Sequence, residues 1–420
     1  MIWGLNPVLS RSHLLSTQIK CCDRKREEKT TMKDFTRMDN LLKSFVEQGT
    51  NPGCAVAVMQ GDELIYHGEV GYADIESGRK VDVHSMFSQA STTKLFTYAI
   101  LGMIYEEGRF LFSDPLYYYL PEWKNTQKYI RRPNGEIDTV PLEKPITIRD
   151  AVAMMCGLPY CMMPAINPTT PTLAAMSRKM EELLKKGPTT IAEEVHAMAD
   201  VPVMFEPGSH WLYGFGSEIT GVLVETFEGK PLREVFKDRL IDPLELEDAD
   251  TFACPENRER LVTIYSKKGP GQFEKAGYFM SPEPDNTPAG ARPNLLISAH
   301  DFAVFMQMLA NGGSYRGKKF LGSGTVAMLH ENQLGPDQLA DFENDYLAGY
   351  GYGLGFRTLL TRKYGHNGNL GNFGWTGGTG IWAEADPVER FSVVYMHNMM
   401  PNEELYHHHR VRAVVNGIML

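Results

Sequence analysis

Cysteine is scarce in this sequence. Six cysteines are spread over 420 residues, and their spacing matches neither a disulfide framework nor a set of zinc ligands. Cys156 and Cys161 have the wrong spacing for a metal knuckle, so we expect buried free thiols there. This usage favours a reducing compartment and predicts no metal site.

Long apolar runs are also missing. No stretch approaches the roughly 20 apolar residues of a membrane-spanning helix. Within residues 1–31, Arg11, His13 and Lys20 interrupt any signal-peptide core. We therefore expect no membrane span and a cytoplasmic location. We interpret residues 1–31 as a disordered leader, or as a mis-assigned start if Met32 is the first residue.

Positive charge is not in excess. The chain has 42 basic and 52 acidic residues, a formal net charge of −10. Its basic residues gather only at 20–33, where a solvated tail is the ordinary explanation. Because a nucleic-acid surface needs a basic face, nucleic acid is not an expected partner.

Several catalytic signatures are absent as well. Without a Gly-x-Ser-x-Gly elbow, an α/β-hydrolase fold is not expected. Neither a glycine-rich phosphate loop nor a His-Glu-x-x-His helix occurs. His407, His408 and His409 adjoin one another in a predicted helix. Because consecutive helical residues point in different directions, we interpret them as surface residues.

Strand character is present at both ends of the chain. The candidate strands are 54–59, 63–72, 380–385 and 391–396. The first two flank a glycine-containing turn, and the last two flank Asp386-Pro387, which is a turn signal. Helical spacing of apolar residues adds a helix at each end, over 35–46 and 403–420.

Helical stretches occupy the middle of the chain. They are 91–107, 148–155, 173–186, 191–199, 217–228 and 232–240. The simplest architecture is of the α/β (α+β) class. An antiparallel sheet flanked by helices forms from residues 32–113 and 289–420, and a mostly helical domain spans residues 114–288.

The pattern Ser-x-x-Lys occurs twice. One copy, Ser77 to Lys80, lies in a polar, glycine-containing segment and predicts a surface turn. The other copy, Ser91 to Lys94, lies in the first turn of an apolar helix, which places the two side chains one turn apart on the same face.

The second copy suits nucleophilic catalysis. A serine hydroxyl needs a base to take its proton, and burial together with the helix dipole would make Lys94 partly neutral. The backbone N–H of Ser91 could also stabilise an oxyanion. The alternative is that Ser91 only caps the helix while Lys94 extends along it to solvent.

A second motif contains Tyr213. It lies in an aromatic run after Pro207-Gly208 and just before a predicted helix, so it could extend into a site. A tyrosine near an ammonium group can pass a proton to a leaving group. The alternative is a core tyrosine with a satisfied hydroxyl.

A third motif is the glycine-rich run from Phe373 to Gly380. Glycines at the start of a strand allow a ligand to approach the backbone closely. The amide of Gly378 could then supply a second oxyanion donor. The alternative is a β-bulge without a catalytic role.

Together these motifs resemble the serine β-lactamase and penicillin-binding-protein superfamily. The similarity covers about residue 34 to the C-terminus, and it is greatest to the class C-related esterases known as family VIII carboxylesterases. It rests on Ser91-Thr92-Thr93-Lys94, on Trp211-Leu212-Tyr213-Gly214 and on Trp375-Thr376-Gly377. The resemblance implies a β-lactamase/transpeptidase-like fold with the site between the two domains.

The resemblance also implies roles for these residues. Ser91 forms an acyl-enzyme, Lys94 and Tyr213 move protons, and the amides of Ser91 and Gly378 hold the oxyanion, with Gly377 beside them. No metal or organic cofactor is needed.

Two positions depart from the β-lactamase pattern. Phe215 stands where an asparagine would bind a substrate amide, and Trp375 stands where a lysine would pair with a substrate carboxylate. Both changes favour neutral acyl esters over β-lactams. His366-Asn367-Gly368 also resembles a version of the third motif, but its distance from Asp386 favours Trp375 and makes His366 a loop residue near the site.

The sequence thus predicts a serine hydrolase acting on a small ester or amide, with acyl transfer as a possible second activity. A β-lactamase and a D-amino-acid amidase or peptidase remain enzymatic alternatives. An inactive scaffold or sensor is the non-enzymatic alternative. The sequence does not indicate the oligomeric state.

Overall fold

The computed structural model of the chain describes residues 33–161, 164–187, 189–276, 294–344 and 346–420. The predicted leader at 1–31 lies outside these residues, and so does the predicted domain boundary at residue 288. The division into two domains therefore stays a prediction.

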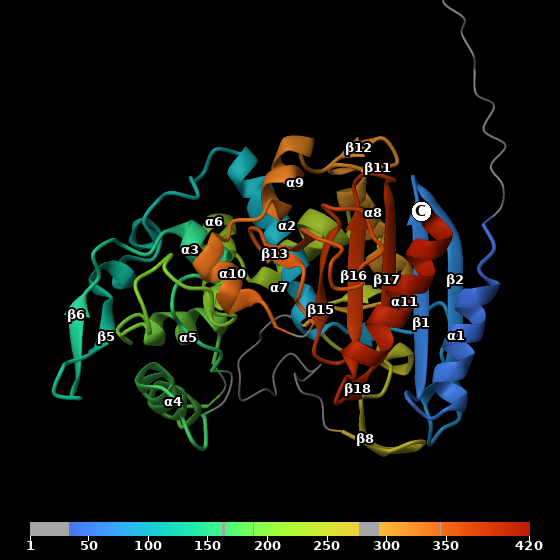
Figure 1. The fold of residues 1–420 in the computed structure, drawn as a ribbon, viewed down its shortest axis with the longest axis horizontal. Helices are drawn as coiled ribbons and strands as arrows, with labels where there is room; N and C mark the ends of the chain where they lie inside the picture. The colour runs from blue at the N-terminus through green and yellow to red at the C-terminus, as the bar shows by residue number, and fades with distance from the viewer. Residues whose placement is uncertain (1–32, 162–163, 188, 277–293, 345) are drawn as a thin grey trace, which may run out of the picture. The chain divides into compact units, whose positions relative to one another are not determined.

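An antiparallel sheet of eight strands joins the two ends of the chain (Figure 1). Its order is β13-β14-β15-β16-β17-β1-β2-β3. The strands are β1 (Gly53–Gln60), β2 (Glu63–Asp74), β3 (Arg79–Lys80), β13 (Tyr350–Tyr352), β14 (Arg357–Leu359), β15 (Phe373–Gly377), β16 (Ile381–Asp386) and β17 (Phe391–Met396). Strand β1, near the N-terminus, meets β17, near the C-terminus, where Ala55 pairs with Met396, so the predicted sheet from both termini is confirmed.

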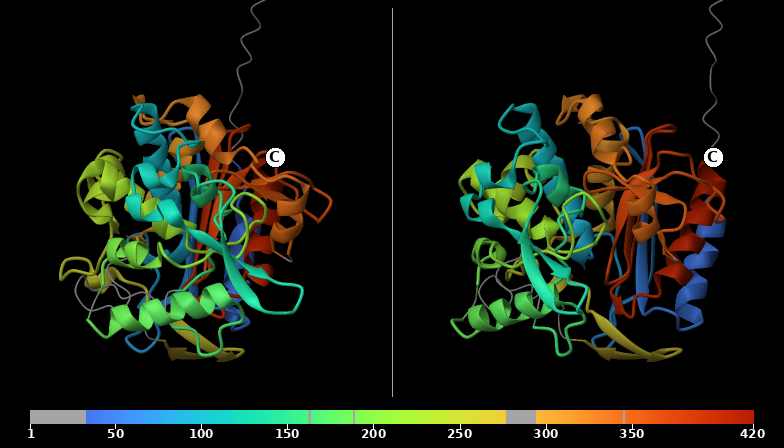
Figure 2. Two further views of the ribbon diagram at one scale, coloured as in Figure 1. Left: turned by 90° about the vertical axis from the view of Figure 1, so that its left-hand side faces the viewer. Right: turned by 60° about the vertical axis from the view of Figure 1, so that its left-hand side comes forward.

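Both faces of this sheet are covered. Helices α1 (Thr36–Glu47) and α11 (Glu404–Met419) pack together on one face, and α8 (Ala299–Ala310) packs on the other (Figure 2). Along β1, Val56 and Val58 join the core under α1, whereas Ala55 and Ala57 join the opposite core. Because alternate residues of a strand point to opposite faces, a strand covered on both sides is apolar throughout.

Most predicted helices are found. They are α2 (Thr93–Glu106), α3 (Ile148–Val152), α4 (Pro171–Leu184), α5 (Ile191–Met198), α6 (Gly216–Glu228) and α7 (Leu232–Phe236), with α9 (Ser323–His330) and α10 (Pro336–Phe342) in addition. Helix α3 ends at Val152, earlier than the expected residue 155, because Met154 adopts a left-handed conformation, with φ of 60°. In the described residues, no helix has both the length and the apolar character needed to cross a membrane.

The middle of the chain also contains strands that the sequence did not predict. A hairpin of β5 (Gln127–Arg131) and β6 (Ile137–Pro141) precedes α3, and β8 (Tyr265–Gly269) pairs with β9 (Gln272–Lys275). Residues of β5 and β6 are exposed or only half-buried. Without a buried face, such strands lack the apolar alternation by which sequence analysis finds a strand.

Candidate active site

Ser91 lies at a sharp elbow between a strand and the helix α2. Strand β4 (Phe87–Ser88) leads into a short 3-10 turn, Ala90–Thr92, and α2 follows at once. Ala90 has φ of 47°, and its backbone N–H donates to Asn294 Oδ1 at 2.9 Å. An alanine is held in this left-handed conformation only where surrounding contacts impose it, and such strain is often found at functional sites.

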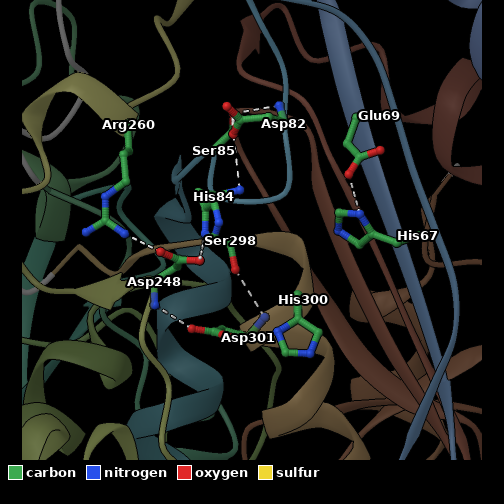
Figure 3. A network of polar contacts seen from close by, with 10 residues as sticks. All are labelled: His67, Glu69, Asp82, His84, Ser85, Asp248, Arg260, Ser298, His300 and Asp301. Carbon is green, nitrogen blue, oxygen red and sulfur yellow. Dashed lines mark hydrogen bonds and ion pairs between the residues drawn. The ribbon is translucent and has the colours of Figure 1, made fainter.

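A polar network anchors the segment just before this elbow (Figure 3). His84 and Arg260 both bind the carboxylate of Asp248, with 2.8 Å between His84 Nδ1 and Asp248 Oδ2. The backbone N–H of Asp248 in turn donates to Asp301 at 2.7 Å, at the start of α8. Strands β4, β10 (Leu296–Ile297) and β7 (Ala249–Asp250) form a small sheet alongside. The elbow is therefore fixed by elements from distant parts of the chain.

Ser91 and Lys94 contact each other as the helical spacing predicts. Lys94 Nζ donates to Ser91 Oγ at 3.2 Å. The same Nζ lies 5.3 Å from the ring centroid of Tyr160 and 5.5 Å from that of Tyr213. Ser91 and Lys94 are each half-buried.

The charge state of Lys94 differs from our expectation. Burial acts to lower its pKa, but the electrostatic influence of Tyr160, Tyr213 and Glu218 outweighs burial, and the net direction is upward. The resting side chain is therefore an ammonium ion and not the partly neutral amine that we predicted. The sequence could not show this, because Glu218 comes from α6 and its proximity depends on the fold.

Tyr213 and Trp375 are brought together. Trp375 Nε1 donates to the Tyr213 hydroxyl oxygen at 3.1 Å, and the two ring centroids lie 5.2 Å apart. Trp375 is therefore a hydrogen-bond donor in addition to the apolar surface that we predicted. A donor directed at a phenolic oxygen stabilises negative charge on that atom.

The end of β15 lies directly against the elbow. A Cβ atom on Gly377 would be only 2.4 Å from the carbonyl oxygen of Gln89, so only glycine allows this approach. The next residue, Gly378, is exposed. Within the described part of the chain, the backbone N–H groups of Ser91 and Gly378 donate to no protein acceptor. Both predicted oxyanion donors are thus free to bind an oxygen atom.

Two of the predicted site residues do not join this group. Phe215 is fully buried at the start of α6, so it offers no surface to a substrate and the predicted contact is corrected. His366 donates from Nε2 to the carbonyl oxygen of Ala348 at 2.8 Å, and its ring contacts Tyr350 and His409. None of these contacts involves Ser91, which agrees with the preference for Trp375 in the third motif.

Sequence analysis missed Tyr160 and Glu218 as neighbours of Lys94. A backbone bridge between Pro159 and Gly214 joins their two loops, and it places the ring centroids of Tyr160 and Tyr213 5.4 Å apart. Tyr160 begins a stretch of aromatic, cysteine and methionine residues, a composition that predicts ordinary core. Its position after Gly157-Leu158 was the available signal. Glu218 had no comparable signal, because it lies within an apolar helix.

The described residues contain no group of three or more histidines, cysteines and carboxylates that could hold a metal ion. Cys156 and Cys161 are buried and form no disulfide, as predicted. Cys54 is also buried and Cys254 is half-buried, and neither forms a disulfide.

Two curated relatives match most of the chain. Protein Rv1367c of Mycobacterium tuberculosis is 25% identical over 372 residues, which cover 86% of this chain and 89% of the relative. A protein of Salmonella agona, provisionally named a D-alanyl-D-alanine carboxypeptidase, is 22% identical over 392 residues, covering 86% of this chain and 82% of its own length.

Solved structures share the fold at low sequence identity. EstCE1, described as a hydrolase with promiscuous acyltransferase activity, superposes with a TM-score of 0.74 at 20% identity, covering 91% of this chain and 98% of EstCE1. A family VIII carboxylesterase superposes with a TM-score of 0.65 at 17% identity, covering 90% and 96% of the two chains. The Beta-lactamase family model matches residues 38–416. This chain therefore belongs to the Beta-lactamase family of serine hydrolases.

Proposed function

We propose that this protein cleaves small neutral acyl esters through a covalent acyl-enzyme on Ser91. The observation that carries the proposal is the 3.2 Å contact between Lys94 Nζ and Ser91 Oγ, placed beside the Tyr213–Trp375 hydrogen bond. A nucleophile, an ammonium group and a second proton carrier then lie together at a half-buried elbow. That arrangement meets the requirements of serine acyl transfer.

Attack of Ser91 Oγ on the ester carbonyl requires a proton acceptor. Because the pKa of Lys94 is raised, we assign the acceptor role to the phenolate form of Tyr213. Its oxygen receives the Trp375 hydrogen bond and becomes a phenol when it takes the Ser91 proton. Lys94 stays charged and compensates the negative charge that moves between the two oxygens. The leaving alcohol then takes the proton from Tyr213, and the amides of Ser91 and Gly378 bind the oxyanion.

The acyl-enzyme is resolved by water or by another alcohol. The description of EstCE1 as a hydrolase with promiscuous acyltransferase activity supports including acyl transfer in the proposal. Partition between the two products, measured with a short-chain nitrophenyl ester in the presence of increasing methanol, distinguishes hydrolysis from transfer.

Labelling with a fluorophosphonate tests the nucleophile. We expect one adduct by intact mass on the native protein and none on Ser91→Ala, with ester turnover reduced by about 10⁴-fold or more. Ser77→Ala is the matched control, because it alters the other Ser-x-x-Lys copy, and it should label like wild type. An adduct that survives Ser91→Ala contradicts the nucleophile assignment, and a native protein without an adduct supports the inactive scaffold.

A second candidate, cleavage of substrates that carry a carboxylate, is favoured by Arg357. This side chain is 2% exposed, and its Cζ lies 4.4 Å from the ring centroid of Tyr350 and 5.9 Å from that of Trp375. No described residue accepts a hydrogen bond from its guanidinium or forms an ion pair with it. Its partners among the described residues are these two aromatic rings. A buried cation without an ion pair is costly, and the carboxylate of a substrate that enters past the rings would supply one. The Salmonella relative's name is consistent with such a substrate.

Matched substrates separate the two candidates. An ester whose leaving alcohol bears a free carboxylate is compared with its methyl-ester analogue on wild type and Arg357→Gln. If Arg357 binds the carboxylate, the variant loses about tenfold or more in kcat/KM for the acid only, since hydrogen bonds to charged groups contribute about 1.5–3 kcal/mol. Equal effects on both substrates exclude this role. Faster cleavage of a chromogenic cephalosporin than of either ester would instead identify a β-lactamase.

A further inference from the structure

The turn between β15 and β16 carries the proposed oxyanion donor Gly378. The backbone N–H of Gly380 donates to the carbonyl oxygen of Gly377 at 2.9 Å and closes the turn. Thr379 is held on both sides: its hydroxyl donates to the Ser88 carbonyl oxygen, and its own carbonyl oxygen accepts from the Met399 N–H, each at 2.9 Å. Gly378 is the exposed residue of this otherwise buried turn.

Two buried histidines hold the far side of the same turn. His408, on α11, lies within hydrogen-bond distance of the Gly380 carbonyl oxygen, with 3.2 Å from Nε2. The backbone N–H of His397, just beyond β17, donates to the same oxygen at 3.4 Å. The His397 ring packs so closely that a Cβ on Gly380, where φ is 106°, would lie 1.9 Å from Nε2.

The hydrogen-bond partners place a proton on Nε2 of both rings. A carbonyl oxygen only accepts, so His408 carries its proton on Nε2 and donates it to Gly380. His397 likewise donates from Nε2 to the carbonyl oxygen of Asn402 at 3.1 Å, while its Nδ1 accepts from the Tyr395 hydroxyl at 2.9 Å. Burial lowers the pKa of each ring well below the usual value, which keeps both neutral.

We propose that His408, supported by His397, is a positioning residue that fixes the amide of Gly378 toward the oxyanion through Gly380. The role rests on the proposed function, because it assumes that Gly378 binds the oxyanion. His408 does not touch substrate. It acts by restraining the carbonyl group two residues beyond the donor, and a preorganised donor stabilises a transition state more strongly than a mobile one.

The structure corrects our interpretation of the three adjacent histidines as surface residues, since two of them are buried and His409 is half-buried. His407 and His408 are 0% and 2% exposed. Their contacts differ, however, because His407 lies beside the Glu403 carbonyl oxygen and the Thr50 hydroxyl, both at 3.2 Å from its ring nitrogens. His407 is thus a buried neighbour on the same helix that makes no hydrogen bond to the turn, although its ring centroid lies 4.9 Å from that of His397. It offers a control for loss of the His408 hydrogen bond.

The test compares His408→Leu, His408→Gln and His407→Leu. The Nε2 atom of glutamine can occupy the place of histidine Nε2, so His408→Gln should stay within about threefold of wild-type turnover. His408→Leu should lower kcat for a short-chain nitrophenyl ester by about tenfold or more with KM nearly unchanged, because loss of a preorganised oxyanion donor affects the transition state. His407→Leu should keep wild-type kcat at a similar loss of thermal stability.

Hydrogen exchange of the peptide spanning the turn provides a readout that is independent of turnover. The amides of residues 378–380 should exchange faster in His408→Leu than in wild type, His408→Gln or His407→Leu. If His408→Leu exchanges faster but the wild-type protein cleaves no ester, the positioning role of His408 is supported and the proposed function is rejected. Equal exchange and equal kcat in the two leucine variants, or no recovery with glutamine, overturns the positioning role.

Discussion

Ser77–Lys80 and Ser91–Lys94 share one spacing but occupy opposite environments. Ser77 is exposed in a turn, where its backbone N–H donates to Asp74 at 2.8 Å, and Lys80 extends over the exposed face of Tyr72 with Nζ 3.3 Å from the ring centroid. Ser91 instead receives a hydrogen bond from Lys94 at the start of a buried helix. The pattern is the same, whereas the secondary structure and the neighbours differ.

The comparison indicates that the reactivity of a Ser-x-x-Lys motif depends on the residues that surround its lysine. Around Lys94 the fold gathers Tyr160 from one segment and Tyr213 and Glu218 from another. Around Lys80 it places a single tyrosine, and solvent covers the rest. We therefore expect catalysis to depend on the neighbours of Ser91 and Lys94 as well as on the serine and lysine themselves.

The largest expected effect separates the two lysines. Lys94→Ala should lower kcat/KM for a short-chain nitrophenyl ester by about 10³-fold, because general acid–base and charge-compensating groups contribute about 10²–10⁴. Lys80→Ala should leave kcat/KM within about twofold, since an exposed lysine of this kind contributes little. Steady-state kinetics on the two purified variants give the comparison. Equal losses would show that the surroundings of Ser91 are not what activates it.

A smaller effect concerns the hydrogen bond to Tyr213. Trp375→Phe removes the N–H donor but keeps an aromatic ring, so we expect kcat to fall about tenfold, corresponding to about 1.4 kcal/mol. Trp211→Phe is the control. Trp211 also stacks on Tyr213, at 6.1 Å between ring centroids, but its buried Nε1 donates to no described acceptor.

The two tryptophan variants should therefore differ in kcat and agree in substrate scope. If Trp211→Phe reduces kcat as much as Trp375→Phe, the aromatic packing around Tyr213 matters and the donated hydrogen bond does not. If neither variant changes kcat, Tyr213 is not the proton acceptor.

Parts of the fold and of the candidate site could be predicted from the sequence, because they depend on the local pattern of residues. The hairpin of β1 and β2 follows from two apolar runs around a turn, and the Ser91–Lys94 contact follows from helical geometry. The choice of Trp375 over His366 depended on distance along the chain from Asp386, and the structure places Trp375 beside Tyr213.

The remainder depends on contacts between distant segments. Arg357, Glu218 and His408 lie in segments whose own pattern is that of ordinary strand or helix, and each becomes notable only through a neighbour from another part of the chain. A single sequence does not report which segments meet. The expectation of a neutral Lys94 was wrong for this reason, because the helix alone omits the groups that raise its pKa.

The smallest expected effect compares the backbones of the two copies. Gly78 has φ of 74° with open space around it, and Ala90 has φ of 47°. Because a Cβ atom in the left-handed region costs about 1–2 kcal/mol, Gly78→Ala should lower the free energy of unfolding by about 1 kcal/mol without altering turnover. Ala90→Gly should relieve strain and raise that free energy by less than about 1 kcal/mol, since glycine also gains entropy in the unfolded chain.

The same Ala90→Gly change makes the elbow more flexible and should lower kcat severalfold. Urea unfolding measures the change in the free energy of unfolding of each variant, and steady-state kinetics measure the change in its kcat. If Ala90→Gly keeps full activity, the strained elbow contributes to folding alone and does not orient Ser91.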